Sequence, residues 1–412
     1  MREDYNSARP MVMHIDLNSC FATVEQQARP RLRGRPVAIV NRRTDHTMIV
    51  TASYEAKAKG VTLGMRLKDA RKLCPDLIGI ESDPPKYKYV YHQLMRIMCD
   101  YSAHVRMKSI DEGVIDFSDT TKVIAGRDLV EIGYEIKQRL WDEVGVAMNC
   151  NVGIGTNRFL AKTAASLHKP NGLDMITHEN LREVMAGLKL TDLTGIAGRF
   201  EKRLNAVGIY TPLEFLDADI ATLRDVVFKG INGVYWHDRL RGWEVDKRDF
   251  SLKSAGRQFV MDGYRLPRKD VLKRLHHLCE ETGAKVRSKG MIARGVMVYA
   301  RTYDYGGWHA KYMAPLPFFS NEAIYAHARR LFAAAPDDIK MIAVTCYGLQ
   351  SATVHSQQMQ LFGDELAREQ AITSAVDEIN ARYGKRVIHS ADTLGTDTYL
   401  KEKIPFGSTR YM

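Results

Sequence analysis

Short apolar runs alternate with amphipathic segments along the first 175 residues of the chain. The runs MVMHI (11–15), VAIV (37–40) and CNVGIG (150–155) predict buried strands. Helical spacing of apolar residues over about 126–143 predicts an amphipathic helix, and two further helices separated by glycines are expected within 53–75. This part of the chain is therefore expected to be mixed α/β.

The pattern changes twice beyond this point. From residue 177 to about 243 all signals are helical, and the charged stretch 246–254 without periodicity predicts a linker. From 255 to 351 the order is strand, helix, two strands, helix and strand, which is typical of a small α+β sandwich with one sheet and two helices. One more helix is expected near 364–383 in the polar C-terminal part.

The composition is that of a globular chain with basic character. The 412 residues suffice for three or four domains, and the formal net charge is +11 with a pI near 9.2. Nine basic residues against three acidic ones lie between Leu266 and Arg301. A concentrated basic stripe favours a nucleic acid partner, although a basic enzyme of small metabolites is also compatible with the net charge.

The cysteines and the chain ends bear on the compartment. The six cysteines are scattered, with no C-x-x-C pair and no spacing typical of zinc ligands. The N-terminal stretch MREDYNSARP lacks an apolar signal core, and no apolar run approaches the roughly 18 residues that a membrane span needs. These features predict a cytoplasmic protein in a reducing environment.

Three acids are the candidate reactive groups. Asp16 ends the first predicted strand, and Asp111 and Glu112 stand in SIDEG (109–113), at the junction of a predicted hairpin. Buried together, three carboxylates are tolerable only with bound cations, and oxygen ligands suit Mg²⁺. Two such ions would form the clamp of an in-line phosphoryl transfer. Solvated turn residues are the alternative for the same acids.

Five segments in this order give the chain a family resemblance. They resemble the successive motifs of the Y-family (lesion-bypass) DNA polymerases of the bacterial polymerase IV and V type, over about residues 11–350. The segments are HIDLNSCFATVE (14–25), TASYEAKAKGV (51–61), SIDEG (109–113), GIGTNRFLAKTAASLHKPNG (153–172) and TGIAGRFEKRL (194–204). The combination is specific, although no single segment is.

The resemblance implies a multidomain fold with α/β and α+β parts, arranged as a right-hand polymerase. It has a palm, small fingers, a helical thumb and a separate α+β little-finger domain. The expected bounds are 11–18 and 77–175 for the palm, 19–76 for the fingers, 176–245 for the thumb with a helix-hairpin-helix, 246–254 for the linker, 255–352 for the little finger, and 353–412 for a clamp-binding motif and a C-terminal tail.

The resemblance also implies the metal ligands. Asp16, Asp111, Glu112 and the backbone carbonyl of Leu17 match the positions that hold two Mg²⁺ ions, for which Mn²⁺ is a substitute. The neighbouring Asp116 has no matching role and is expected to be structural.

Other matching positions imply a nucleotide pocket. Tyr54, Lys57 and Lys169 match residues that bind the triphosphate, and Thr51 adds a hydroxyl group. Phe21 matches the steric gate, an aromatic ring that clashes with a 2′-hydroxyl group and so favours deoxynucleotides. The family frequently has arginine at the position of Lys57, and a lysine lacks the bidentate geometry of arginine. Considered alone, Lys57 could be a surface lysine, and Phe21 could be a helix residue facing the core.

The expected DNA contacts lie in two places. Gly195, Gly198 and Arg199 belong to a stretch that resembles a helix-hairpin-helix, for which a plain helical turn is the alternative. Within the basic stripe the expected DNA-binding residues are Arg287, Lys289 and Arg294, with contacts to phosphates rather than bases.

A peptide that resembles the bacterial sliding-clamp binding motif follows. It reads QMQLF, with Gln358, Leu361 and Phe362 as the matching positions, and the start of another helix is the alternative.

The sequence thus indicates a template-directed DNA polymerase of low fidelity that acts in translesion synthesis. Its expected partners are primer-template DNA, deoxynucleoside triphosphates and a sliding clamp, and the chain is expected to be a monomer, with accessory subunits left open. A catalytically silent DNA-binding or clamp-regulating protein and a palm-fold nucleotide cyclase remain as alternatives.

Overall fold

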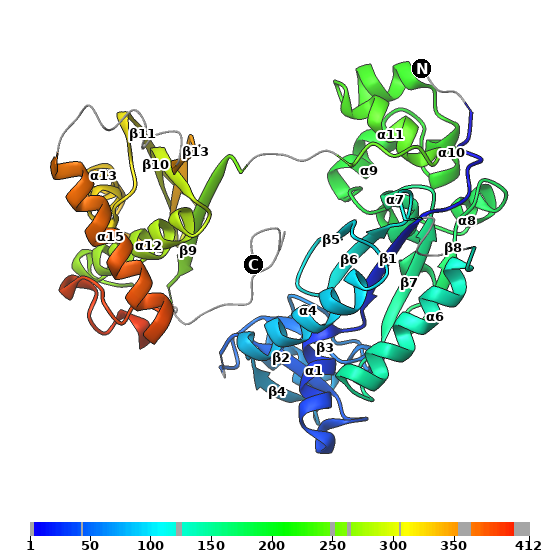
Figure 1. The fold of residues 1–412 in the computed structure, drawn as a ribbon, viewed down its shortest axis with the longest axis horizontal. Helices are drawn as coiled ribbons and strands as arrows, with labels where there is room; N and C mark the ends of the chain where they lie inside the picture. Colours follow the sequence, from blue (N-terminus) through cyan, green and yellow to red (C-terminus); the bar gives the residue numbers. More distant parts are fainter. Residues whose placement is uncertain are drawn as a thin grey trace. The chain divides into compact units, whose positions relative to one another are not determined.

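The structure, a computed structural model, describes residues 4–42, 44–120, 126–247, 252–261, 265–304, 306–352 and 364–398. These residues form two compact units, the first ending at residue 247 and the second beginning at residue 252 (Figure 1). Within the described ranges no helix is both long and apolar enough to cross a membrane.

A five-stranded sheet forms the centre of the first unit (Figure 1). Its middle strand β1 runs antiparallel to both of its neighbours, β6 and β7, and β8 is parallel to β7. The apolar runs predicted as strands at 11–15 and 150–155 are β1 and β7. In spatial order the strands are β5 (Val105–Met107), β6 (Glu112–Asp116), β1 (Val12–Leu17), β7 (Cys150–Gly155) and β8 (Leu173–Met175).

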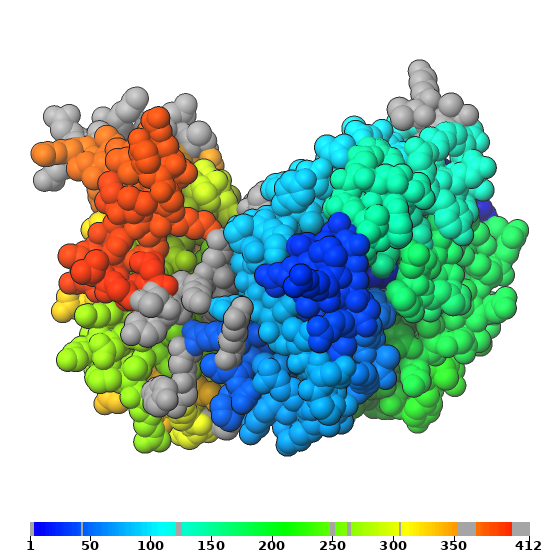
Figure 2. All heavy atoms as spheres, turned by 90° about the horizontal axis from the view of Figure 1, so that it is seen from below, coloured from blue at the N-terminus to red at the C-terminus, as the bar shows by residue number. Residues whose placement is uncertain are grey.

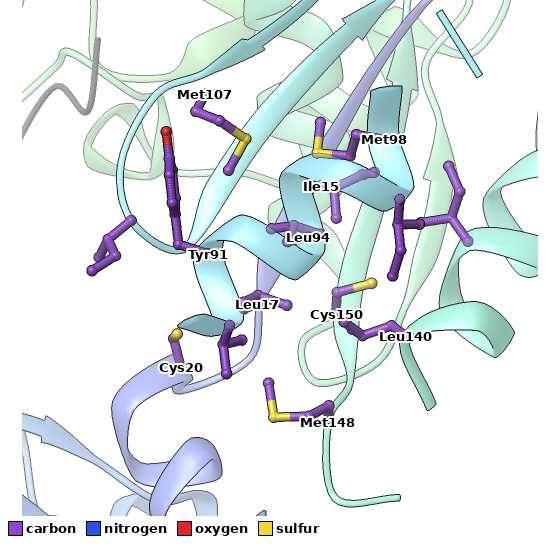
Figure 3. Close-up of a cluster of buried hydrophobic side chains, with 14 of the residues drawn as sticks. Ile15, Leu17, Cys20, Tyr91, Leu94, Met98, Met107, Leu140, Met148 and Cys150 are labelled. Carbon is purple, nitrogen blue, oxygen red and sulfur yellow. The ribbon is translucent and has the colours of Figure 1, made fainter. Parts of the chain in front are cut away.

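The two faces of this sheet differ because side chains alternate along a strand. Ile15 and Leu17 of β1 point into a fully buried apolar cluster with Leu94 and Met98 of helix α4 (Pro84–Cys99), as Figure 3 shows. On the opposite face Val12 contacts Ala161. That face is covered by α7 (Arg158–Leu167), which contacts β1, β7 and β8, whereas α6 (Leu129–Arg139) packs on the cluster side.

A three-stranded sheet lies next to the first, joined to it through α1 (Cys20–Ala28). β2 is parallel to β4 and antiparallel to β3, and two short helices pack on this sheet around buried Ala56 and Leu67. The two helices expected within 53–75 are present. The elements are β2 (Val37–Val40), β3 (Ile49–Ala52), β4 (Ile78–Glu81), α2 (Tyr54–Ala58) and α3 (Leu67–Leu73).

The last part of the first unit is helical, as the sequence predicts for 177–243. Phe215 and Trp236 are central to its core, and Trp236 packs edge-on against Phe159 of α7 at 5.5 Å between ring centroids. This contact ties the helical part to the central sheet. The helices are α8 (Leu181–Ala186), η3 (Leu190–Asp192), α9 (Gly198–Asn205), α10 (Pro212–Asp217), η4 (Thr222–Val227) and α11 (Asn232–Leu240).

The second unit is one antiparallel sheet with two helices on one face, in the order that the sequence predicts. Val296, Val298, Ile342 and Val344 from the two central strands bury their side chains under these helices. The elements are β9 (Ser254–Val260), α12 (Arg268–Arg287), β10 (Met291–Thr302), β11 (Gly307–Phe318), α13 (Asn321–Phe332), β12 (Ile339–Tyr347) and β13 (Gln350–Ser351), with the sheet order β11-β10-β12-β9 and β13 paired to β10.

Residues 364–398, here called the C-terminal segment, also belong to the second unit. The helix expected near 364–383 is α15 (Asp364–Tyr383), and the turns η5 (Ala391–Thr393) and η6 (Thr396–Thr398) contact α12. In Figure 2 the orange and red residues of this segment lie against yellow-green residues of the same unit. The segment is therefore a docked part of the domain.

Candidate active site

Asp16 and Glu112, two of the three predicted acids, are cross-strand neighbours. Asp16 near the end of β1 pairs directly with Glu112 at the start of β6, and both lie on the sheet face that α7 covers. His14, two residues before Asp16, lies on the same face. The side-chain ligand atoms of His14, Asp16 and Glu112 all lie within 4.8 Å of one another.

A lysine balances these carboxylates. The ammonium Nζ of Lys162 on α7 donates to Asp16 Oδ2 at 2.8 Å and also contacts Glu112 Oε2. His14 Nε2 lies 3.1 Å from the same Glu112 oxygen. Burial by itself raises the pKa of Glu112, but the hydrogen bond with His14 and the charge of Lys162 outweigh it and lower the pKa to about 2. Glu112 is therefore a carboxylate at neutral pH.

Asp111, the third acid, precedes β6 and is held by its backbone and by a serine. Leu17 N–H donates to the carbonyl of Asp111 at 2.9 Å, and the hydroxyl of Ser109 donates to Asp111 Oδ1. Burial raises the pKa of Asp111, and the nearby charges of Asp16 and Glu112 raise it further, while the bond from Ser109 opposes them. The structure thus brings together the three acids that the sequence singles out.

A cavity of about 320 Å³ opens beside the acids. Asp16 and Asp111 line it, whereas Glu112 lies on the side of Lys162. All five residues predicted for the nucleotide pocket also line it: Phe21, Thr51, Tyr54, Lys57 and Lys169.

Two lysines give the cavity a positive wall. Lys169 Nζ donates to Asp16 Oδ2 at 3.0 Å, the same oxygen that Lys162 contacts. Lys57 Nζ donates to Ser19 Oγ at 2.8 Å and lies 4.5 Å from the centroid of the Tyr54 ring. Burial lowers the pKa of Lys57, and the charge of Lys169 lowers it further. Two ammonium groups near each other favour an anionic occupant.

Phe21 forms an apolar part of the same wall. It follows the first residue of α1, its exposed fraction is 3%, and its ring lies 4.6 Å from that of Tyr87 in α4. Tyr87 is held in turn because its hydroxyl group donates to Glu25 Oε1 at 3.1 Å. The ring of Phe21 therefore has a fixed position at the cavity edge.

The predicted helix-hairpin-helix forms an exposed turn before α9. Gly195 has a φ of 102°, a conformation that favours glycine, and an added Cβ would lie 3.1 Å from the Trp236 ring. Gly198 begins α9, and Arg199 next to it is exposed. The turn and the helix start are exposed, and the first N–H groups of a helix have no partner within the helix.

Comparison with known proteins identifies the family. The impB/mucB/samB family model matches residues 15–166, and the model of the impB/mucB/samB family C-terminal domain matches residues 253–361. The chain is 32% identical over 398 residues to DNA polymerase IV of Moorella thermoacetica, which covers 93% of this chain and 96% of that protein. The chain belongs to the impB/mucB/samB family of Y-family DNA polymerases. DNA polymerase IV 1 of Bacillus subtilis is 28% identical, with 93% of each chain covered.

Solved structures share the fold of this Y-family polymerase. The Y-family DNA polymerase chimera Dbh-Dpo4(243-245)-Dbh matches 82% of the chain and 99% of its own length, with a TM-score of 0.71 and 23% identity. An insertion ternary complex of Dbh DNA polymerase matches the same shares with a TM-score of 0.56.

The chain is a DNA-directed DNA polymerase of the translesion type, which acts on primer-template DNA and deoxynucleoside triphosphates. The family membership excludes the cyclase that the sequence leaves open. The acids Asp16, Asp111 and Glu112 speak against the catalytically silent protein.

One predicted DNA-binding residue of this polymerase has a different environment. The guanidinium of Arg287 pairs with Asp377 of the C-terminal segment at 2.6 and 2.8 Å and donates to the carbonyl of Phe319, and only 11% of the side chain is exposed. These contacts engage the donors of Arg287 inside the second unit, so we expect Arg287 to hold the C-terminal segment in place.

Arg294 and Lys289, the other two predicted residues of the basic stripe, have other surroundings than Arg287. Arg294 donates to the carbonyls of Ala314 and Pro315 at the sheet edge. Burial lowers the pKa of Lys289, and the charges of Lys285 and Arg257 lower it further, so three cations lie near one another. Gln358, Leu361 and Phe362 of the clamp motif lie outside the described residues.

Sequence reasoning missed His14 and Lys162. The signal for His14 was available, since a residue two positions before Asp16 on a strand must share its face. Lys162 stands in FLAK within a recognised segment, but only the packing of α7 brings it to the acids.

The donor set fits a divalent cation. Carboxylate oxygens of Asp16 and Glu112 converge on the ammonium group of Lys162, and the charges of both acids raise the pKa of the nearby Asp111. Such oxygens are the ligands of hard cations.

Proposed function

We propose that this polymerase uses Asp16, Asp111 and Glu112, with the carbonyl of Leu17, to hold two Mg²⁺ ions for nucleotidyl transfer. The observation that carries the proposal is the direct opposition of Asp16 and Glu112, with the ammonium group of Lys162 between them. When bound, the ions would activate the primer 3′-hydroxyl group and stabilise the charge on the leaving pyrophosphate. Mn²⁺ would serve as a substitute.

The cavity beside these acids is the proposed deoxynucleotide site. Lys57 and Lys169 would bind phosphate oxygens by charge, while the hydroxyl groups of Tyr54 and Thr51 would donate hydrogen bonds to phosphate oxygens. These donors line the cavity, so they lie where charge would develop in the transition state.

Phe21 is the proposed steric gate of this site. Its ring lines the cavity and packs against Tyr87, so a 2′-hydroxyl group would clash with the ring. Deoxynucleotides are then selected by exclusion of the competitor.

DNA would be held through its phosphates. Gly195, Gly198 and Arg199 offer backbone N–H groups and a guanidinium on the exposed turn before α9, and Lys289 and Arg294 would add charge from the second unit. Contacts of this kind read no sequence. They tolerate distorted templates, which agrees with low fidelity in translesion synthesis.

Two further proposals rest on the sequence. QMQLF would dock the chain on a sliding clamp through Gln358, Leu361 and Phe362. A cytoplasmic location agrees with the six cysteines, which are all free thiols.

Primer extension across an abasic site tests the metal assignment. We expect Asp111→Asn and Glu112→Gln to reduce extension about a thousandfold or more, because each change removes a ligand charge, while DNA affinity measured by fluorescence anisotropy stays near that of the wild type. Asp116→Asn on the same strand is the matched control and should extend primers normally. Normal extension by the first two variants would refute the assignment.

A further inference from the structure

Lys162 is the cation that lies between the two opposed acids, and the proposed mechanism gives it no task. We infer that Lys162 is a positioning residue, a resident counter-ion that holds Asp16 and Glu112 in place and weakens metal binding, an effect that Lys169 adds to until a nucleotide arrives. The inference rests on the proposed metal site.

The position of Lys162 is fixed by unusually close packing of its helix. α7 lies directly on β7 at Gly153 and Gly155: a Cβ at Gly153 would come within 2.1 Å of the backbone of Ala161, and one at Gly155 within 2.7 Å. Lys162 follows Ala161, so the approach of helix to strand fixes where its side chain starts. Only 20% of this side chain is exposed. The ammonium is therefore built into the site and does not sample it from solvent.

The two carboxylates need such a charge when no metal is bound. Like charges directly opposed on neighbouring strands repel each other, and half-buried carboxylates interact more strongly than exposed ones. Asp16 and Glu112 are 14% and 23% exposed. Lys162 contacts one oxygen of each, which replaces repulsion by two attractive contacts.

The same contacts compete with a metal ion. Asp16 Oδ2 accepts hydrogen bonds from both Lys162, at 2.8 Å, and Lys169, at 3.0 Å. Because two ammonium groups engage the lone pairs of this oxygen, these lone pairs are less available to a metal ion. The positive charge of the two ammonium groups also repels a metal ion.

Nucleotide binding would relieve half of this competition. Lys169 lines the cavity, so the phosphates of a nucleotide would attract its ammonium away from Asp16. Asp16 then keeps one lysine partner in place of two, and its affinity for the metal rises. By linkage the metal raises nucleotide affinity by the same factor, so the site fills with both together.

The experiment measures Mn²⁺ binding to the full chain without DNA or nucleotide, from the electron paramagnetic resonance signal of free Mn²⁺. Lys162→Met removes the charge and keeps an apolar stem of similar length. We expect this variant to bind Mn²⁺ about tenfold more tightly than the wild type. Lys162→Arg keeps the charge and should stay close to the wild type. Lys59→Met, at a surface ion pair with Asp76, changes the net charge equally and should leave Mn²⁺ affinity unchanged.

A second readout separates a counter-ion from a residue that only packs. Without metal, the melting temperature of Lys162→Met should fall by a few degrees through carboxylate repulsion, and saturating Mn²⁺ should restore it. A fall that Mn²⁺ does not repair would overturn the counter-ion role.

Asp16→Asn, made in the wild type and in Lys162→Met, identifies the site. If Asp16→Asn abolishes Mn²⁺ binding but Lys162→Met binds no better than the wild type, the inference on Lys162 is wrong and the metal site stands. If Mn²⁺ binding does not depend on Asp16, the proposed metal site itself is wrong. Binding that is too weak to measure in both the wild type and Lys162→Met also contradicts the inference, because loss of the ammonium must strengthen it.

Discussion

Asp16 and Glu112 pair directly across β1 and β6, on the one face of the sheet that faces α7. Ile15 and Leu17, the two sequence neighbours of Asp16, are buried in the apolar cluster on the other face (Figure 3). A one-residue shift of β1 would bury Asp16 among apolar side chains, so the cost of that burial fixes the register. The apolar core and the reactive acids are thus two consequences of one strand.

Phe21→Ala should raise ribonucleotide use. Removal of the ring opens space beside the sugar at the cavity edge, so we expect the ratio of kcat/KM for a ribonucleotide to that for the matching deoxynucleotide to rise about tenfold or more. The measurement is single-nucleotide insertion on an undamaged template.

Folding of that variant needs a control. Loss of a buried phenylalanine costs about 3 kcal/mol of stability, so Phe21→Leu serves as a milder change with a smaller expected rise. An unaltered ratio in both folded variants would remove Phe21 from the gate role.

The pH dependence of stability should carry a signature of Glu112. Its pKa is about 2 in the folded chain against an ordinary 4.5. A carboxyl group whose pKa falls on folding contributes stability that is complete above its ordinary pKa and is lost as the pH falls through the folded value. In the metal-free wild type we expect this loss between pH 4.5 and about 2.

Urea unfolding at about pH 5, 4 and 3 measures that loss. Glu112→Gln cannot titrate and should lose less stability over the interval than the wild type does. Equal losses in the two proteins would show that Glu112 is not held as a carboxylate by Lys162 and His14.

The sequence predicted the strands that carry the site for a physical reason. Strands buried on both faces read as continuous apolar runs, and β1 and β7 do. The strands β3 and β4 escaped prediction because they flank stronger helical signals, whereas the equally short β2 reads as a continuous apolar run.

The residues that contact the acids were harder to predict from the sequence than the acids themselves. Asp16, Asp111 and Glu112 stand at strand ends inside recognised segments. Lys162 reaches Asp16 and Glu112 only because Gly153 and Gly155 let α7 approach β7. That approach is a property of tertiary packing. The docking of the C-terminal segment was equally hidden, because it depends on ion pairs between residues 90 or more positions apart.

Arg386 should hold the C-terminal segment on α12. Its guanidinium contacts Glu280 Oε2, Asp397 Oδ1 and Thr393 Oγ1, and Glu280 also accepts from the N–H of Ser390. Arg386→Met would leave a buried carboxylate without its cation, at a cost of about 3 kcal/mol. We expect faster hydrogen exchange throughout α12 and η5 and a lower urea midpoint, whereas Arg368→Met at an exposed position of α15 should change neither. Unchanged exchange in Arg386→Met would show that the segment is held by other contacts.

Arg287 and Lys289 lie two residues apart and should nevertheless respond to substitution in opposite ways. Arg287 is committed to Asp377 and to the Phe319 carbonyl, so Arg287→Met should lower the stability of the second unit by about 2 kcal/mol and leave the salt dependence of DNA affinity unchanged. Burial lowers the pKa of Lys289, and the neighbouring charges of Lys285 and Arg257 lower it further. Substitution of Lys289 would remove a phosphate contact.

For Lys289→Met we therefore expect a slope of log affinity against log salt that is about one unit shallower. Fluorescence anisotropy of a primer-template between about 50 and 200 mM salt gives the slope, and urea unfolding gives the stability. A shallower slope for Arg287→Met would mean that Arg287 leaves Asp377 to bind DNA, and it would restore the role that the sequence predicted. If neither variant changes the slope, the phosphate contacts of the second unit lie away from the end of α12.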